Sequence, residues 1–199
     1  MTEPALKIQG EAVIPTDWGP FVMKAYSSEA EDRMPHFALL RDPLDFEKTV
    51  NVRVHSECIT GDIFKSNRCE CGEQLSISMD YIAKNGGVVI YLRQEGRGIG
   101  IINKLHAYEK QDLGMDTAEA NIALGFKIDE RSYSDAVTIL KDLGVTRINL
   151  LTNNPDKISA FEGSGIVVDQ RIPVIVKAKK ENEGYLKTKK DVFGHFLDI

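Results

Sequence analysis

Four short apolar stretches follow one another in the first quarter of the chain, at 12–14, 21–23, 37–40 and 50–54. The first three are brief apolar runs, whereas 50–54 alternates apolar with polar side chains, and this period of two is typical of a β-strand. A Trp-Gly-Pro turn at 18–20 separates the first two stretches. The pattern therefore predicts that the chain begins with several short strands.

The pattern then changes to a helical period. Leu75, Met79, Ile82 and Ala83 form one helical stripe, which an Asn-Gly-Gly sequence ends at 85–87. The continuous apolar run at 88–92 is what a buried strand requires. A glycine-rich turn at 94–100 opens a helix that extends to about Asp112, and another helix is predicted from 134 to 143.

The last third of the chain alternates the two patterns. Strands are predicted at 148–151, 166–168 and 172–176, with a helix that begins at Asn154-Pro155 and a C-terminal helix after a charged loop. N-terminal strands followed by alternating strands and helices indicate an α+β (mixed α/β) fold. We expect a single compact domain over 1–199, in which 1–8 and about 177–184 are flexible.

Composition narrows the class of protein. The chain has 199 residues, of which 42% are hydrophobic and 28% charged, and its formal net charge is −5. This balance does not predict a nucleic-acid partner, so any anion binding must be local. No apolar run has the length of a signal peptide or a membrane span. Three cysteines without a secretion signal argue against disulfides, and we expect a reduced, cytoplasmic protein.

The three cysteines, Cys58, Cys69 and Cys71, are the strongest chemical signal. Three thiolates fill three corners of a tetrahedral zinc and leave the fourth for water, which is the layout of a catalytic zinc site. The alternative is that they are unrelated small core residues. The polar neighbours of the cysteines, His55 among them, argue against a simple core.

Three further motifs are open to two interpretations each. The turn at 94–100 either binds a phosphate, through close approach of its backbone and the guanidinium of Arg97, or is a plain tight turn. Thr152 and Lys157 can bind a base or a phosphate, or they flank an Asn N-cap. Asp129 and Arg131 are an acid/base with a cation for the transition state, or a surface ion pair. His36, His106 and His195 have no local context, and we assign them no ligand role.

Together these segments resemble GTP cyclohydrolase II, the enzyme that begins riboflavin biosynthesis from GTP. The resemblance covers nearly the whole chain, from about Ile14 to His195. It is carried by Arg-Val-His-Ser-Glu-Cys (53–58), Thr-Gly-Asp (60–62), Arg-Cys-Glu-Cys-Gly (68–72), Gln-Glu-Gly-Arg-Gly-Ile-Gly (94–100), Asn-Lys (103–104), Asp-Thr-Ala-Glu-Ala-Asn (116–121), Asp-Glu-Arg (129–131) and Leu-Leu-Thr-Asn-Asn-Pro (150–155).

The resemblance implies a role for each matched residue. Cys58, Cys69 and Cys71 match the ligands of one zinc ion per subunit. The positions that match GTP binding are Arg53, Val54, His55, Ser56, Glu57, Gln74, Glu95, Gly96, Arg97, Thr117, Thr152 and Lys157. Asp129 matches the proton acceptor, Arg131 the nucleophile, and Tyr108 a tyrosine of catalysis. Two departures are Glu70, where the family usually has Asp, and His106, where it often has Arg.

The implied reaction converts GTP and water to 2,5-diamino-6-ribosylamino-4(3H)-pyrimidinone 5′-phosphate, formate and diphosphate. A zinc-bound water is expected to attack guanine C8, and Mg²⁺ is expected with the triphosphate. Either Glu57 or Glu95 would read the guanine edge. Because a guanidinium is a poor nucleophile, Arg131 has a second interpretation as an electrostatic stabiliser. The family also implies a homodimer, and the chain resembles the stand-alone form, without a dihydroxybutanone phosphate synthase domain.

Two other functions compete with this one. A related GTP cyclohydrolase would stop at the formamidopyrimidine, and the motifs do not exclude it. A regulatory or nucleic-acid-binding module held by zinc is the other. The net charge, the missing fourth ligand and the lack of a basic aromatic patch all disfavour that module.

Overall fold

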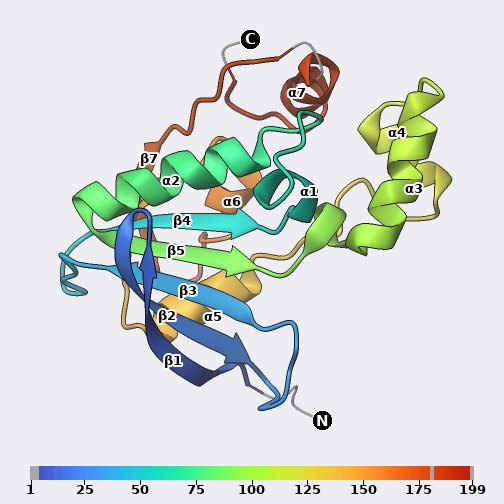
Figure 1. Ribbon diagram of the computed structural model, residues 1–199. Coiled ribbons are helices and arrows are strands. Elements are labelled where there is room, and N and C mark those ends of the chain that lie inside the picture. Colours follow the sequence, from blue (N-terminus) through green and yellow to red (C-terminus); the bar gives the residue numbers. More distant parts are fainter. Residues whose placement is uncertain (1–4, 180–181, 198–199) are drawn as a thin grey trace.

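The computed structural model describes residues 5–179 and 182–197, and these residues form one mixed sheet with the strand order β1-β2-β3-β5-β4-β6-β7 (Figure 1). Antiparallel pairing joins β1 to β2, β2 to β3, and β3 to β5, and parallel pairing joins β4 to β5, β4 to β6, and β6 to β7. The strands are β1 (Lys7–Thr16), β2 (Gly19–Ser27), β3 (His36–Arg41), β4 (Val50–Ser56), β5 (Gly87–Leu92), β6 (Arg147–Leu151) and β7 (Val167–Ile172).

Helices cover both faces of the sheet and extend beyond one end of its parallel strands (Figure 1). None of those in the described part of the chain has both the length and the apolar character needed to cross a membrane. They are α1 (Ile59–Asp62), α2 (Cys71–Asn85), the 3₁₀ turn η1 (Glu95–Gly98), α3 (Gly100–Asp112), α4 (Thr117–Ala123), α5 (Ser134–Asp142), α6 (Pro155–Ser159) and α7 (Glu183–Asp191).

The central position of β5 in the sheet explains why its sequence is continuously apolar. Val88, Ile90 and Leu92 belong to the larger core cluster, which also contains the α5 residues Ile139 and Leu140. Val89 points the other way, into a smaller cluster with residues of α2. A strand with helices on both faces has no solvent side on which to place polar residues. The α+β class with N-terminal strands, as expected from the sequence, is confirmed.

The local predictions fail at three places. The strand expected at 172–176 is wrong, because β7 ends at Ile172 and Pro173 has no amide hydrogen for a ladder. The next amide, that of Val174, bonds instead to Asn153 Oδ1 at 3.0 Å. The short helices α1 and α4 were not expected at all. Of the segments expected to be flexible, 1–4 and 180–181 lie outside the described residues, while β1 already begins at Lys7.

The parallel strands determine where a functional site can form. Ser56 at the end of β4 pairs with Leu92 at the end of β5, so the segments that follow these strands leave the sheet side by side. β6 runs parallel to β4 on its other side and ends at Leu151. Loops at the carboxyl ends of adjacent parallel strands are the usual place for a ligand. α1, η1 and α3 lie at this end of the sheet (Figure 1).

Candidate active site

Two glycines allow the three cysteines to meet. Cys58 follows β4, and Cys71 begins α2. A Cβ atom on Gly72 would lie 2.1 Å from the carbonyl oxygen of Gly61, and a Cβ on Gly61 would lie 2.9 Å from Cys69 Sγ. Neither position tolerates a side chain, so α1 can pack directly on the start of α2. As a result, the three sulfur atoms lie within 4.8 Å of one another.

The donor set of the cysteines fits a metal ion such as zinc. Cys58 and Cys69 are buried, and their sulfur atoms lie 3.6 Å apart. Hydrogen bonds from Cys69 and Cys71 hold the pKa of the Cys58 thiol well below its usual value, and the same interaction raises the pKa of Cys69 to about 11. The cluster on its own thus holds one negative charge, and a divalent cation would let all three thiols ionise. All three cysteines also line a cavity of about 90 Å³, which leaves one side of the cluster open.

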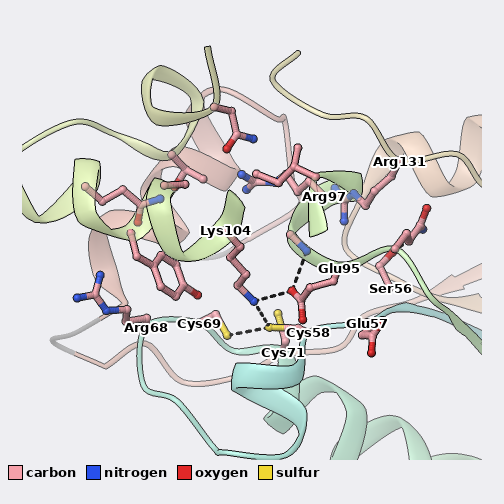
Figure 2. A pocket seen from close by; sticks show the side chains of 18 residues that line it. Ser56, Glu57, Cys58, Arg68, Cys69, Cys71, Glu95, Arg97, Lys104 and Arg131 are labelled. Carbon is pink, nitrogen blue, oxygen red and sulfur yellow. Dashed lines mark hydrogen bonds and ion pairs between the residues drawn. The ribbon is translucent and has the colours of Figure 1, made fainter. Parts of the chain in front are cut away.

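Lys104 of α3 reaches from the opposite wall of this cavity to the sulfur atoms (Figure 2). Its Nζ donates to Cys58 Sγ at 3.1 Å, to Thr60 Oγ1 at 3.0 Å and to Glu95 Oε1 at 2.7 Å. Burial opposes the charged form, but the Cys58 thiolate and Glu95 raise the pKa of Lys104 above its usual value. A buried ammonium ion with three polar partners is an electrostatic anchor for the cysteine cluster.

Glu57 and Glu95, the two carboxylates that could read a base edge, differ in the hydrogen bonds and ion pairs that they already make. Glu95 accepts from Lys104 and from the Gly96 amide on one oxygen, and from the Ile59 amide at 2.5 Å on the other. Glu57 lies in the same cavity, with its Oε2 3.3 Å from Arg93 Nε, and burial raises its pKa. The carboxylate of Glu95 is therefore committed to the protein, whereas that of Glu57 has a single cationic neighbour among the described residues.

Tyr108 stands one helical turn after Lys104 and shares its cavity. The ring lies between two cations, with Arg68 Cζ 4.9 Å and Lys104 Nζ 5.7 Å from the ring centroid. Burial raises the pKa of the Tyr108 hydroxyl, which therefore keeps its proton at neutral pH. The tyrosine can donate a hydrogen bond to a ligand in the cavity.

His55 is oriented by a buried carboxylate. Its Nε2 lies 3.0 Å from Asp62 Oδ2, and the same carboxylate accepts from the Tyr91 hydroxyl and from the Cys58 amide. Burial lowers the pKa of His55, although the Asp62 hydrogen bond opposes this shift. Its Nδ1 is buried without a hydrogen-bond partner in the described part of the chain. The ring faces a second cavity rather than the sulfur atoms.

The second cavity, of about 50 Å³, adjoins the first and is rich in cations. Arg53 donates to the Leu151 carbonyl at 3.0 Å and to Gln74 Oε1 at 3.1 Å. Lys157 donates to the Val54 carbonyl at 2.7 Å. Burial lowers the pKa of Arg53 to about 10, and burial together with Arg53 and Arg131 lowers that of Lys157 well below its usual value. Such a concentration of buried cations in an acidic chain suits a polyanion.

Arg131 lies at the boundary, because it lines both cavities. Its Nε donates to Asp129 Oδ1 at 2.9 Å and its Nη2 to Asp129 Oδ2 at 2.5 Å. Burial works against ionisation of Asp129, but Arg131 outweighs it and lowers the pKa of that carboxyl. The pair is two-pronged and mostly buried, with 14% and 23% of the side chains exposed, so it is not the simple surface ion pair that the sequence left open.

The structure brings nearly all the sequence-predicted site residues to these two cavities. The first is lined by Ser56, Glu57, Cys58, Cys69, Cys71, Glu95, Gly96, Arg97, Tyr108, Thr117 and Arg131. The second is lined by Arg53, His55, Ser56, Cys71, Gln74, Thr152, Lys157 and Arg131. Two predicted residues line neither cavity. The Val54 side chain is buried in the core, and Asp129 acts through Arg131.

The residues of the two cavities and their supports that have no role from the sequence include Asp62, Lys104, Lys189 and His195. Asp62 and Lys104 lay inside matched motifs, and the spacing of four between Lys104 and Tyr108 already places both on one helix face. Lys189 and His195 line the second cavity from the C-terminal part of the chain. No local pattern pointed to them, since their neighbours in the cavity are distant in sequence.

Comparison with known proteins identifies similar chains of one family. The family model described as GTP cyclohydrolase II matches residues 7–173. A GTP cyclohydrolase-2 from Campylobacter hominis is 47% identical over 193 residues, which cover 97% of this chain and 96% of that protein. One from Campylobacter fetus subsp. fetus is 49% identical over 187 residues, or 94% of each chain.

A second kind of relative is longer. The riboflavin biosynthesis protein RibBA of Bacillus subtilis is 50% identical over 189 residues, which cover 94% of this chain and 47% of the relative. The chain thus spans about half the length of RibBA relatives and nearly the full length of the two Campylobacter proteins. The match to the family model and the identity to these relatives together show that the chain belongs to the GTP cyclohydrolase II family.

Proposed function

We propose that the protein hydrolyses GTP to 2,5-diamino-6-ribosylamino-4(3H)-pyrimidinone 5′-phosphate, formate and diphosphate, the first step of riboflavin biosynthesis. One observation carries the proposal: a cysteine cavity and a cationic cavity adjoin, and Arg131 lines both. A nucleotide whose base and phosphates both react needs two such compartments at a fixed separation. The family membership and the names of the Campylobacter relatives support the same assignment.

At the base end, Cys58, Cys69 and Cys71 would hold a zinc ion, one per subunit. When bound, the ion supplies Lewis acidity and activates water for hydrolysis at guanine C8. Three thiolates donate strongly and weaken that acidity, and the ammonium of Lys104 offsets part of their charge through Cys58. Tyr108 is the group that assists proton transfer here, because it keeps its proton and shares the cavity. His55 is less suited, since it faces the other cavity.

Glu57 is the residue we assign to the guanine edge. A carboxylate there accepts from guanine N1–H and from the 2-amino group, and adenine would leave it mispaired at high cost. Glu95 would have to give up hydrogen bonds to Lys104 and two backbone amides to do the same. Glu57 lines the cavity and, within the described residues, would give up only its ion pair with Arg93.

At the phosphate end, Arg53, Lys157 and Arg131 would bind the triphosphate together with Mg²⁺. Arg131 stabilises charge on the α-phosphate while a water attacks, and it is not the nucleophile. Asp129 supports this role, because a carboxylate paired with two guanidinium nitrogens keeps the guanidinium protonated. Asp129 is thus a positioning residue that holds the cation at the junction of the two cavities.

The assembly is a further part of the proposal. Ile102 and Leu105 on α3 and Ile122 on α4 are large apolar side chains, and they are 70%, 51% and 58% exposed. Surfaces of this kind usually mark an interface. We assign these side chains to the interface of a homodimer. Each chain is proposed to be a single domain, and the protein to be cytoplasmic.

The test is a product balance. The zinc-loaded protein is incubated with GTP and Mg²⁺, and formate, diphosphate and the diaminopyrimidine are quantified. Equal amounts of formate and diphosphate are expected. Diphosphate without formate would identify the related enzyme that stops at the formamidopyrimidine. A folded, metallated sample that turns over no GTP would reject the proposed function.

A further inference from the structure

The C-terminal strap, residues 182–197, lies beyond the part of the chain that the family model matches, yet it contacts the site at several points. Lys189 Nζ donates to Glu70 Oε1 at 2.7 Å, between two of the cysteines. The guanidinium of Arg97 stacks on the Phe193 ring at 4.4 Å. The Phe196 amide donates to the Asn153 carbonyl at 2.9 Å. The strap is therefore attached to both cavities and not only to the rim of the sheet.

Two side chains of the strap enter the cationic cavity. Lys189 and His195 line it beside Arg53, Arg131 and Lys157. A hydrogen bond of 3.0 Å from the His195 amide to the Lys189 carbonyl joins the two positions of the strap. The cavity thus receives cationic or polar nitrogen groups from β4, from α6 and from a segment far along the chain.

The described part of the cavity wall holds three buried nitrogens without a hydrogen-bond partner. They are Arg53 Nε, His55 Nδ1 and His195 Nδ1. Buried polar atoms are nearly always paired, so unpaired ones around a single cavity indicate a missing ligand. Two of the three side chains, His195 and Arg53, also lie among cations that repel one another. Burial and then Lys189 and Arg131 lower the pKa of His195 to about 2. An anion would relieve both costs.

The acidic groups at the cavity are paired with Lys189 and Arg131, and not with Arg53 or Lys157. Glu70 accepts from both Lys189 and Gln74 on one oxygen, and its other oxygen is buried without a partner in the described residues. Gln74 in turn accepts from Arg53. Asp129 is already paired with Arg131. In the described residues, Arg53 and Lys157 donate to carbonyl oxygens and an amide, so no carboxylate competes with a ligand for them.

We propose that Lys189 and His195 of the C-terminal strap bind the polyphosphate chain of the substrate and close the phosphate end of the site over it. The proposal rests on the proposed function for the identity of the substrate. The cavity measures about 50 Å³, far below the roughly 300 Å³ or more of sites that bury small ligands, so a wall must move before a nucleotide enters. The strap is a wall that lies outside the sheet, and it can open without disturbing the strands (Figure 1).

The test measures binding of inorganic diphosphate to the intact, zinc-loaded protein by titration calorimetry. The variants are Lys189→Met and His195→Ala, and the matched control is Lys187→Met, which removes an exposed lysine from the same helix. Both strap variants should bind diphosphate about 10-fold more weakly or worse, as expected for a lost contact to a charged group. Their KM for GTP should rise in parallel, while guanosine affinity and the affinity of the control for diphosphate stay unchanged.

Folding is controlled in two ways. Lys189→Met leaves the buried Glu70 carboxylate without its cation, so the double variant Lys189→Met/Glu70→Gln removes both charges of the pair. His195→Ala removes a ring whose Nδ1 has no hydrogen-bond partner among the described residues, and therefore tests the cavity without disturbing the Lys189–Glu70 pair. Zinc content and the melting temperature identify any variant whose site has collapsed.

The outcomes separate the strap from the proposed function. Diphosphate affinity within about twofold of the unaltered protein in both strap variants overturns the inference, as does an unaltered protein that binds no diphosphate. If the unaltered protein binds diphosphate through the strap but turns over no GTP, the polyphosphate site stands and the proposed function fails.

Discussion

Replacing Arg131 by lysine is the sharpest test of how the diphosphate is released. The guanidinium holds Asp129 with two nitrogens, at 2.9 and 2.5 Å, and lines both cavities. Lysine keeps the charge but offers a point contact instead of a fork. The loss of one charge-assisted hydrogen bond in the transition state, about 1.5–3 kcal/mol, predicts that diphosphate release slows by about 10- to 100-fold. Arg131→Ala, which also removes the charge, should cost about 1,000-fold.

The assay is the rate of diphosphate release from GTP at saturating Mg²⁺, with zinc content as the control for folding. An unchanged rate in Arg131→Lys would refute the assignment of Arg131 to charge stabilisation by a two-pronged contact. Isolation of a covalent protein–GMP adduct from the unaltered protein, and not from Arg131→Lys, would refute the reasoning more directly. In that case Arg131 would be the nucleophile, and Asp129 would have to accept its proton.

Three other perturbations have defined outcomes. Cys69→Ser should abolish bound zinc and formate release but leave diphosphate release, because Cys69 does not line the cationic cavity; metal analysis and the product balance check this. Lys104→Met should lower the free energy of unfolding in urea by about 3 kcal/mol, since Glu95 loses its buried cation. A decrease of less than about 1 kcal/mol would contradict the role of Lys104 as an electrostatic anchor. Burial and neighbouring cations lower the pKa of His195 from 6.5 to about 2. Between these two pH values the native state binds fewer protons than the unfolded state. The free energy of unfolding therefore decreases as the pH falls below 6.5. His195→Gln removes this slope, and between pH 8 and pH 5, without phosphate, it should gain about 2 kcal/mol relative to the unaltered protein in urea unfolding.

The sheet could be predicted because the burial of each strand determines its pattern of apolar and polar residues. The 88–92 run is apolar at every position since helices cover both faces of β5. α4 was missed because it is short, although its capping box was readable: Asp116 accepts from the Glu119 amide, and the Glu119 side chain accepts from the Asp116 amide. The strand predicted at 172–176 is wrong because its apolar residues resemble a strand pattern, whereas Pro173 has no amide hydrogen to donate to the ladder.

The site could be predicted only where its residues are close together in sequence or belong to a matched motif. The segment 53–58 carries a large share of it because one strand end places those side chains at both cavities. Lys104 meets Cys58 across 46 positions and Lys189 meets Glu70 across 119. Contacts of this kind depend on how α3 and α7 dock on the sheet end. No local pattern encodes that docking, so the division into two cavities had to come from the structure.

Charge compensation explains how two unlike cavities can share a wall. Three ionised thiols with a divalent cation would carry one net negative charge, and Lys104 lies against Cys58 with one positive charge. The same ammonium is also paired with the carboxylate of Glu95, so the thiolates and Glu95 share it. Among the described residues, no carboxylate is paired with Arg53 or Lys157, so both are left for the polyphosphate although the chain as a whole is acidic. Arg131 is the exception, since Asp129 neutralises it while its fork stays fixed at the boundary. The arrangement places directional hydrogen bonding, rather than excess charge, at the point where the α-phosphate would join the nucleoside.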